Sequence, residues 1–264
     1  MKNKIIIVVL IGMVALCLIA CAGIRANQEK AEGHLAVGTA FIRSGDYTNA
    51  LRELFAAEEI TPHDPKVHYY LGIAYLGKDA RDRAFKEFQK AVDLEPDYSE
   101  AHNYLGTLYL EEKQWDLAIA SFDRALSNLL YDTPSVSMYN KGWALYKKGE
   151  YRKSLEYNRK AAQLRDASPL MPHLQKNMGL ACLALGEYSE ASIHFTEAVK
   201  LVPNYAEAKY WLAVTKVRQK NYAEGGRLFQ DLVQNHPQSE YSVRAKHMLE
   251  KMKKGQYEEV RWTP

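Results

Sequence analysis

The residues of this chain that could undergo or support chemistry are a cysteine near the N-terminus and a set of evenly spaced histidines. Cys21 ends the run Leu18-Ile19-Ala20-Cys21, in which an aliphatic residue lies three places before the thiol and a small residue lies just before it. That order suits cleavage before Cys21 and transfer of a diacylglyceryl group to its thiol, as in a bacterial lipoprotein box. The sequence therefore predicts lipidation at Cys21, with attached acyl chains such as palmitate.

The first 20 residues have the order of an export signal. Two lysines precede an apolar run from Ile5 to Ile19 that contains no acidic residue. The run is long enough that an uncleaved membrane anchor is the competing interpretation. We expect a signal peptide over residues 1–20 and a lipidated linker over residues 21–30, with the acyl chains holding the protein on the bilayer. The small, uncharged Ala22 favours the bacterial outer membrane, with the protein facing the periplasm.

His34, His68 and His102 recur at intervals of 34 residues and are the nearest approach to a metal constellation. One shared ion is awkward for three side chains on stacked helices, because neighbouring helices lie roughly 8–10 Å apart. We interpret the histidines as packing side chains and predict no metal site. The chain also has no phosphate-binding glycine loop, serine elbow or cysteine pairs at zinc spacing. The sequence therefore predicts no enzyme activity, no cofactor and no small-molecule substrate.

The composition indicates a folded protein that does not bind nucleic acid. The chain is 47% hydrophobic, which is enough to build a sizeable core. Removal of the signal peptide takes away two of the 35 basic residues, which leaves 33 against 32 acidic ones. That balance lacks the clustered basic surface that nucleic-acid binding needs. Cys182 would then remain as the free thiol, and we expect it to be buried and inert.

The period of 34 residues extends well beyond the histidines. Gly38, Gly72 and Gly106 are spaced by 34, and alanines and aromatic residues recur at the same interval. Small residues let the two helices of a hairpin approach closely, aromatic residues fill the space between hairpins, and proline ends the second helix. This period is the length of a tetratricopeptide helical hairpin, and the chain resembles that family.

The resemblance implies an all-α protein, a right-handed superhelical solenoid of six tetratricopeptide helical hairpins with a C-terminal capping helix. We expect the six units at residues 31–64, 65–98, 99–134, 135–171, 172–205 and 206–239, the capping helix at 240–254 and a tail without periodicity at 255–264. The period slips by two residues after the third unit. The fourth unit is degenerate, with Ser154 and Asn158 where other units carry alanine and an aromatic or leucine residue.

The inner surface of such a solenoid is lined by the first helix of each unit, at the second, fifth, ninth and twelfth places. These places predict a partner-binding groove formed by Tyr69, Ile73, Leu76, Asn103, Leu110, Tyr139, Trp143 and Tyr146. An apolar and aromatic groove suits an amphipathic helix or an extended apolar segment. The alternative for each aromatic side chain is packing between units. The lysine and asparagine pairs that would clamp a terminal carboxylate are absent from these places.

A lipoprotein box followed by six such units resembles the pilotin lipoproteins of type IV pilus biogenesis. The segment Asn128 to Pro134, followed by Tyr139-Asn140-Lys141-Gly142, adds to the resemblance because a tyrosine and a proline precede an Asn-x-Gly helix start. Leu129 and Asp132 depart from it, since many members carry prolines there. The resemblance implies a protein that binds a hydrophobic segment of the pilus secretin subunit and promotes its localisation and multimerisation. The alternative function is a lipidated scaffold for peptidoglycan hydrolases and synthases.

Overall fold

The computed structural model describes residues 25–260. The expected signal peptide, the lipidation site Cys21 and residues 261–264 lie outside the described residues. Residues 25–260 form α-helices and short 3-10 helices, with no strand among them. None of the helices in this part of the chain is both long enough and apolar enough to cross a membrane.

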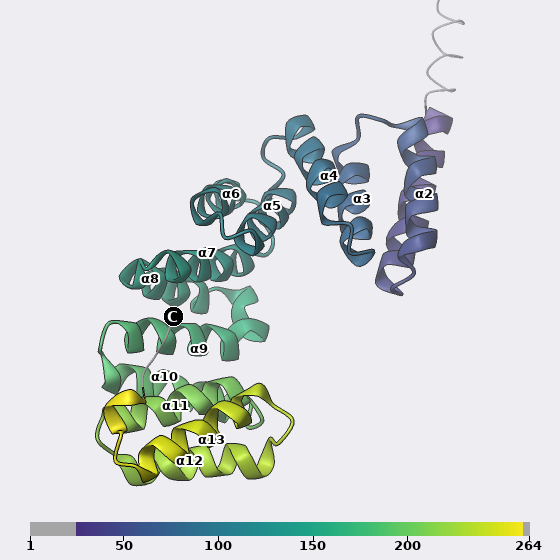
Figure 1. The fold of residues 1–264 in the computed structure, drawn as a ribbon. Helices are drawn as coiled ribbons and strands as arrows, with labels where there is room; N and C mark the ends of the chain where they lie inside the picture. Colours follow the sequence, from purple (N-terminus) through teal and green to yellow (C-terminus); the bar gives the residue numbers. More distant parts are fainter. Residues whose placement is uncertain (1–24, 261–264) are drawn as a thin grey trace, which may run out of the picture. The chain divides into compact units, whose positions relative to one another are not determined.

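The chain divides after Leu108 into two compact units, which are described separately. In the first unit residues 25–43 are helical, and α2 (Tyr47–Ile60), α3 (Pro65–Gly77) and α4 (Arg81–Leu94) follow (Figure 1). The division falls within α5 (Ser99–Glu111). The second unit continues with α6 (Trp115–Ser127), α7 (Pro134–Lys148), α8 (Tyr151–Ala162), η1 (Arg165–Leu170), α9 (Met171–Ala184), α10 (Tyr188–Leu201), α11 (Ala206–Arg218), α12 (Tyr222–Asn235), α13 (Glu240–Lys253) and η2 (Tyr257–Glu259).

The helices pair in the order in which they follow one another along the chain. Helices α3 and α4 pack together in the first unit, and the pairs α7 with α8, α9 with α10 and α11 with α12 do so in the second. Each pair is joined by a tight turn, so its members run antiparallel (Figure 1). The all-α architecture of helical hairpins predicted from the 34-residue period is confirmed.

The turn inside each hairpin places one residue in the left-handed region of backbone conformation. The fifteenth place of all six units has this conformation: Gly45 (φ 79°), Asp79 (57°), Lys113 (61°), Gly149 (88°), Gly186 (77°) and Lys220 (63°). Glycine adopts it freely, whereas a residue with a side chain bears a cost of about 1 kcal/mol. Three of the six hairpins therefore have a residue other than glycine at a turn position that favours glycine.

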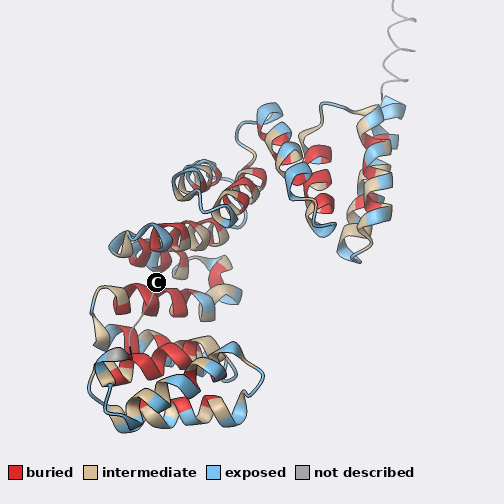
Figure 2. Ribbon diagram, in the orientation of Figure 1, coloured by how far each residue is buried: buried red, intermediate tan, exposed pale blue. Residues whose placement is uncertain are grey.

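Small residues lie where the two helices of a hairpin come closest. A Cβ atom on Gly72 would lie 2.6 Å from the ring of Phe88, and one on Gly179 would lie 2.7 Å from the ring of Phe195. Both phenylalanines are completely buried, as are the alanines one turn before them. Figure 2 shows the buried residues along the facing sides of the helices within each unit. The regular hairpins thus have a dry, closely packed core.

The fourth hairpin, formed by α7 and α8, has a polar core. Ser154 and Asn158 are completely buried, and the amide nitrogen of Asn158 donates to the backbone oxygen of Ser154 at 2.8 Å. The amide oxygen of Asn158 is buried without a hydrogen-bond partner among the described residues. A Cβ atom on Gly142 would lie 2.5 Å from Nδ2 of Asn158, so the close approach of the helices is kept although the residue is polar.

The two ends of the described chain differ from the sequence expectation. Residues 25–30, expected within the linker, are helical, because they are good helix formers and Arg25 pairs with Glu29 at 3.1 Å one turn later. The tail, expected to have no periodicity, forms η2 after the capping helix α13. Its Val260 is completely buried in the core of the second unit. The sequence missed this contact because a single apolar residue has no periodicity.

Candidate partner-binding surface

Three residues of the predicted groove lie on α7, spaced so that they share one side of the helix. The rings of Trp143 and Tyr146 stack with centroids 5.1 Å apart and planes 9° from parallel. Trp143 is partly exposed, whereas Tyr146 is only 6% exposed and packs against Tyr151 of α8 at 5.4 Å. The expectation that Tyr146 faces a partner is therefore wrong. It supports the indole ring of Trp143 instead.

Two lysines flank the indole ring of Trp143. Nζ of Lys147 lies 4.8 Å from the ring centroid and Nζ of Lys176 lies 5.0 Å from it. Lys176 is 7% exposed, and its burial lowers its pKa although Glu207 lies 3.4 Å away and acts in the opposite direction. These cation–π contacts fix the ring, and the exposed Lys147 leaves positive charge beside it, whereas the charge of Lys176 is balanced by Glu207. The surface therefore suits a ligand that is apolar with acidic neighbours.

Tyr139 begins a row of amphipathic side chains that runs from α7 toward α11. Its ring lies 6.4 Å from the ring of His173, which in turn lies 5.4 Å from the ring of Tyr205. Nδ1 of His173 and the hydroxyl of Tyr205 form a hydrogen bond of 2.8 Å. Burial raises the pKa of Tyr139 and of Tyr205 and lowers the pKa of His173. The row is therefore uncharged at neutral pH and offers rings and hydrogen-bonding groups together.

The predicted groove residues of the first unit are more involved in packing against other side chains than those of α7. Tyr69 lies within an aromatic cluster, 5.1 Å from Tyr98, 5.8 Å from Tyr104 and 6.0 Å from Phe88 between ring centroids. The alternative interpretation, packing between helices, describes this residue well. Ile73, Leu76 and Asn103 are half-buried. In the second unit, Leu110 packs against the buried cluster of Ala118, Phe122 and Ala144.

The histidines of the repeat form hydrogen bonds between helices. Nδ1 of His34 lies 2.7 Å from Glu53, and Nδ1 of His68 lies 2.9 Å from Glu87. Nε2 of His68 donates to the backbone oxygen of Pro62 at 2.9 Å. Burial would lower the pKa of His68, but these hydrogen bonds outweigh it and raise the pKa. The histidines therefore fasten adjacent helices to each other, as packing side chains do.

The ligand atoms of Glu58, His68 and Glu87 all lie within 4.8 Å of one another, a spacing that a metal ion could use. Glu58 also lies 3.2 Å from Nζ of Lys90. Lys90 and the raised pKa of His68, which favours its protonated form, provide positive charge beside the two carboxylates. This arrangement gives the cluster a structural role in the first unit.

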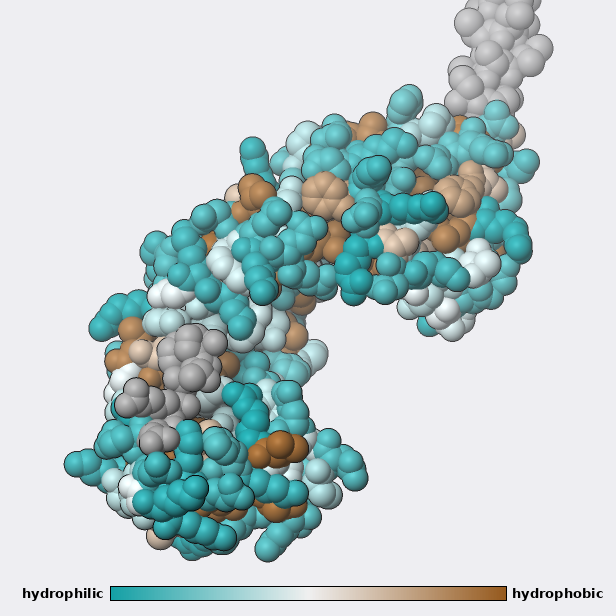
Figure 3. Space-filling model, in the orientation of Figure 1, coloured by the Kyte–Doolittle hydropathy of each residue, from teal (hydrophilic) through white to brown (hydrophobic). Residues whose placement is uncertain are grey.

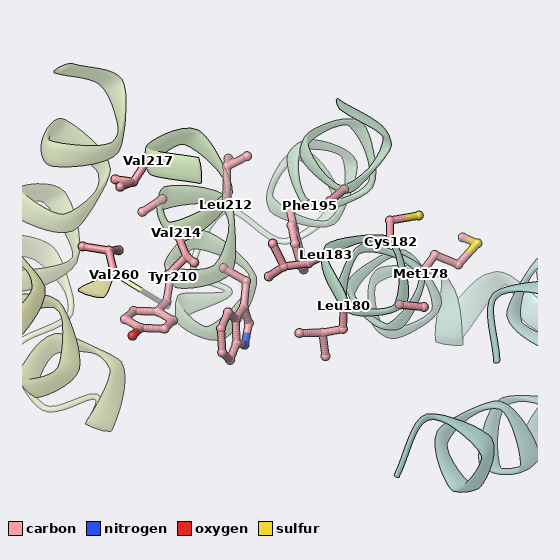
Figure 4. Close-up of a cluster of buried hydrophobic side chains, with 14 of the residues drawn as sticks. Met178, Leu180, Cys182, Leu183, Phe195, Tyr210, Leu212, Val214, Val217 and Val260 are labelled. Carbon is pink, nitrogen blue, oxygen red and sulfur yellow. The ribbon is translucent and has the colours of Figure 1, made fainter. Parts of the chain in front are cut away.

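Cys182 is completely buried in the largest cluster of apolar side chains of the second unit (Figure 4). Burial raises the pKa of its thiol to about 11. The thiol therefore stays protonated at neutral pH, and the expectation of a buried, inert cysteine is confirmed.

Sequence reasoning missed the continuation of this surface beyond the fourth hairpin. Six of the eight residues at the same places of the fifth and sixth units are buried: Lys176, Leu180, Leu183, Tyr210, Val214 and Val217. The 34-residue period was sufficient to predict which residues occupy these positions. It gave no indication that Val260 of the C-terminal tail would join the apolar cluster that contains Tyr210, Val214 and Val217. Figure 3 shows, on the face that it draws, small separate hydrophobic patches on a mostly hydrophilic surface.

Comparison with known sequence families identifies the repeat. A family described as TPR repeat matches residues 38–79, a tetratricopeptide repeat family matches residues 69–129 and 176–240, and a further tetratricopeptide repeat family matches residues 136–167. The matches include the degenerate fourth hairpin. The chain is a tetratricopeptide-repeat protein. The matched families are interaction scaffolds, and none of them is a catalytic family.

Solved structures of other tetratricopeptide-repeat proteins share the fold. PilW, described as a widely conserved type IV pilus biogenesis factor, is 22% identical with a TM-score of 0.71, over 80% of this chain and 96% of that one. PilF of Pseudomonas aeruginosa is 18% identical with a TM-score of 0.73, over 84% and 99% of the two chains. YrrB, described as having an unusual peptide-binding site, is 20% identical with a TM-score of 0.60, over 74% and 97%. At these identities the likeness shows the fold alone.

One curated relative matches at higher identity over a shorter stretch. The photosystem I assembly protein Ycf3 of Sorghum bicolor is 31% identical over 97 residues, which cover 31% of this chain and 55% of that protein. The chain thus spans about half the length of this relative.

Proposed function

We propose that this chain is a pilotin, an outer-membrane-anchored lipoprotein that binds the type IV pilus secretin and promotes its localisation and multimerisation. Two independent observations support the proposal. The lipoprotein box and the Asn128–Pro134 junction resemble the pilotin family in sequence. The fold is similar to that of PilW and PilF over nearly the whole length of those chains.

The observation that carries the proposal is the aromatic surface of α7. A secretin subunit in transit exposes apolar segments that are destined for the membrane. The partly exposed ring of Trp143, held by Tyr146 beneath it and by the two flanking lysines, is a rigid anchor for such a segment. Tryptophans in fixed positions dominate binding energy at many protein interfaces. The uncharged row from Tyr139 to Tyr205 would hold the register of the bound segment.

In this proposal, acyl chains on Cys21 would hold the aromatic surface at the membrane in which the secretin assembles. Two or more acyl chains hold a protein on a bilayer almost irreversibly, whereas one chain does not. A Cys21→Ser variant is expected to move from the outer-membrane fraction to the soluble periplasmic fraction. Retention of this variant in the outer-membrane fraction would contradict lipid anchoring at this residue.

The experiment that tests the binding role uses the double variant Tyr139→Ala, Trp143→Ala in cells that depend on the chain for secretin assembly. We expect at least a fivefold loss of detergent-resistant secretin multimers, since a dominant interface residue contributes about 2 kcal/mol or more. Trp115→Ala is the matched control, because Trp115 is also half-buried but lies on α6, the second helix of its hairpin. Normal multimers with a folded double variant would overturn the assignment. Loss of a murein enzyme's activity instead would favour the peptidoglycan scaffold.

A further inference from the structure

The C-terminal tail returns to the molecule after the capping helix. Gly255 adopts a left-handed backbone conformation, with φ 74°, and its amide donates to the backbone oxygen of Met252 at 3.0 Å. The amide of Gln256 donates to the backbone oxygen of Lys251 at 3.0 Å. These bonds end α13 sharply, as a glycine after a helix commonly does. The following residues, through η2 to Val260, lie against the sixth hairpin.

The tail makes three specific contacts with that hairpin. The ring of Tyr257 stacks on the ring of Tyr222 in α12, with centroids 4.0 Å apart. Glu258 lies 3.5 Å from Nη1 of Arg218 at the end of α11. Val260 is completely buried in the same apolar cluster as Tyr210, Val214 and Val217, and Figure 4 shows it beside α11. Aromatic, ionic and apolar contacts thus come from Tyr257, Glu258 and Val260, within a stretch of four residues.

The covered part of α11 belongs to the inner surface of the repeat. Val214 is at the ninth place of the sixth unit, a place that faces a ligand in this fold, whereas Val217 at the twelfth place packs against α12, with its Cγ2 2.6 Å from where a Cβ atom on Gly225 would lie. The capping helix α13 already packs on both α11 and α12, so the end of the stack is closed without the tail. The tail therefore lies where a bound segment would lie.

Arg218 is held in position for an acidic partner. Its Nε and Nη2 donate to the hydroxyl of Tyr188 at 3.3 and 3.0 Å, and its guanidinium lies 5.4 Å from the centre of that ring. Nη1 remains directed to Glu258. Beside this pair an open cavity of about 480 Å³ continues along Leu183 and Leu185 at the end of α9. A fixed guanidinium recognises an acidic residue with little ordering cost on binding, and Leu183 and Leu185 in the mostly polar wall of the cavity can contact an aliphatic neighbour.

We propose that this part of the sixth hairpin is a second peptide-binding site, and that the tail is its resident ligand. The site takes partner segments with the chemistry of the tail, in which an aromatic and an acidic residue precede an aliphatic residue. A partner segment must displace the tail, which is tethered by a short linker and competes at a millimolar effective concentration. The site is formed by α11 and α12 with the adjoining end of α9 and start of α10, so it does not depend on which partner binds the aromatic surface of α7.

The test measures binding of a labelled, end-capped peptide with the sequence of residues 255–260 to the purified chain by fluorescence anisotropy. In the variant Val260→Asp the tail is released, because a carboxylate is not accommodated in the apolar cluster. We expect this variant to bind the peptide at least tenfold more tightly than the unmodified chain, in which the tail occupies the site. In the released variant, Arg218→Ala is expected to weaken peptide binding severalfold. Arg227→Ala, an exposed arginine on α12, is the matched control.

A second variant keeps the test decisive if Val260→Asp does not fold. Glu258→Lys changes a side chain that is 83% exposed and turns its contact with Arg218 into repulsion, so it loosens the tail without altering the core. Peptide binding that increases in either folded variant, and that depends on Arg218, supports the proposal. Folded variants that bind the peptide no better than the unmodified chain overturn it, because the tail is then only a cap of the last hairpin.

Discussion

The fourth and fifth hairpins, both in the second unit, have the same backbone arrangement, but the core of the fourth is polar and the core of the fifth is apolar. At the seventh, twentieth and twenty-fourth places, the fifth hairpin has Met178, Ala191 and Phe195, which are all buried. At the same places, the fourth hairpin has Lys141, Ser154 and Asn158, which are buried too. The helices still meet closely at the glycine of the eighth place in both hairpins. The fold therefore requires that the two helices of a hairpin approach closely, but it does not require that the core between them be apolar.

The polar hairpin is also the one that carries the aromatic surface. Lys141 forms an ion pair with Asp123, lies 2.7 Å from the hydroxyl of Tyr157, and is 5% exposed. Its pKa is raised because these partners outweigh its burial. Such a network fixes α7 in position but gains less free energy than an apolar core. Sites of function are where natural sequences depart from the rules of local stability, and α7 fits that pattern.

The largest expected effect comes from truncating the apolar core of the fifth hairpin. Phe195→Ala removes a completely buried ring, and we expect the free energy of unfolding to fall by about 3–5 kcal/mol. Asn158→Ala, at the same place of the fourth hairpin, is expected to cost less than about 1.5 kcal/mol, since it also removes a buried oxygen without a partner. Urea unfolding measures both. Equal losses of unfolding free energy in the two variants would contradict the proposed difference between the two cores.

A smaller effect is expected from restoring an apolar residue in the fourth hairpin. Asn158→Leu copies Leu54, which is completely buried at the same place of the first hairpin. We expect a gain of about 1–2 kcal/mol in the free energy of unfolding, because the buried amide is replaced by apolar contacts. Hydrogen exchange of α7 and α8 localises the gain. A destabilised variant would mean that Asn158 contributes hydrogen bonds that an apolar side chain cannot replace.

The smallest expected effect on stability comes from the turn of each hairpin, which has the same residue type in the fourth and fifth hairpins. Both have glycine at the fifteenth place, whereas the sixth hairpin has Lys220 with φ 63°. Lys220→Gly is expected to raise the midpoint of thermal unfolding by the equivalent of about 0.5–1 kcal/mol. The reverse change in the fifth hairpin, Gly186→Lys, serves as the control and is expected to lower the midpoint. No shift in either variant would show that the turns adapt at no cost.

The sequence predicts the hairpins well because each one is a local structure. A small residue, an alanine and an aromatic residue at fixed spacing specify two helices that contact each other within about 34 residues of chain. Helical periodicity also predicts that Tyr139, Trp143 and Tyr146 share one side of α7. It does not predict that Tyr151 of α8 covers Tyr146 and leaves Trp143 partly exposed, since that depends on how the two helices pack.

The tail shows the limit of periodicity more clearly. Its attachment rests on one valine, one ring and one ion pair, which contact residues about 35 to 50 positions earlier in the chain. Nothing in the spacing of residues 255–264 indicates those contacts. Single contacts of this kind depend on the surface already formed by the helices, so they can be found only in the folded structure.

The central claim is that the chain binds an apolar partner through Trp143, and co-purification tests it most directly. The chain is isolated from solubilised envelope, and the bound proteins are identified and quantified by mass spectrometry. We expect secretin subunits to accompany the unmodified chain and the Trp115→Ala control, and we expect Trp143→Ala to reduce their recovery at least tenfold. Undiminished recovery with folded Trp143→Ala, or murein enzymes in place of a secretin, would contradict it.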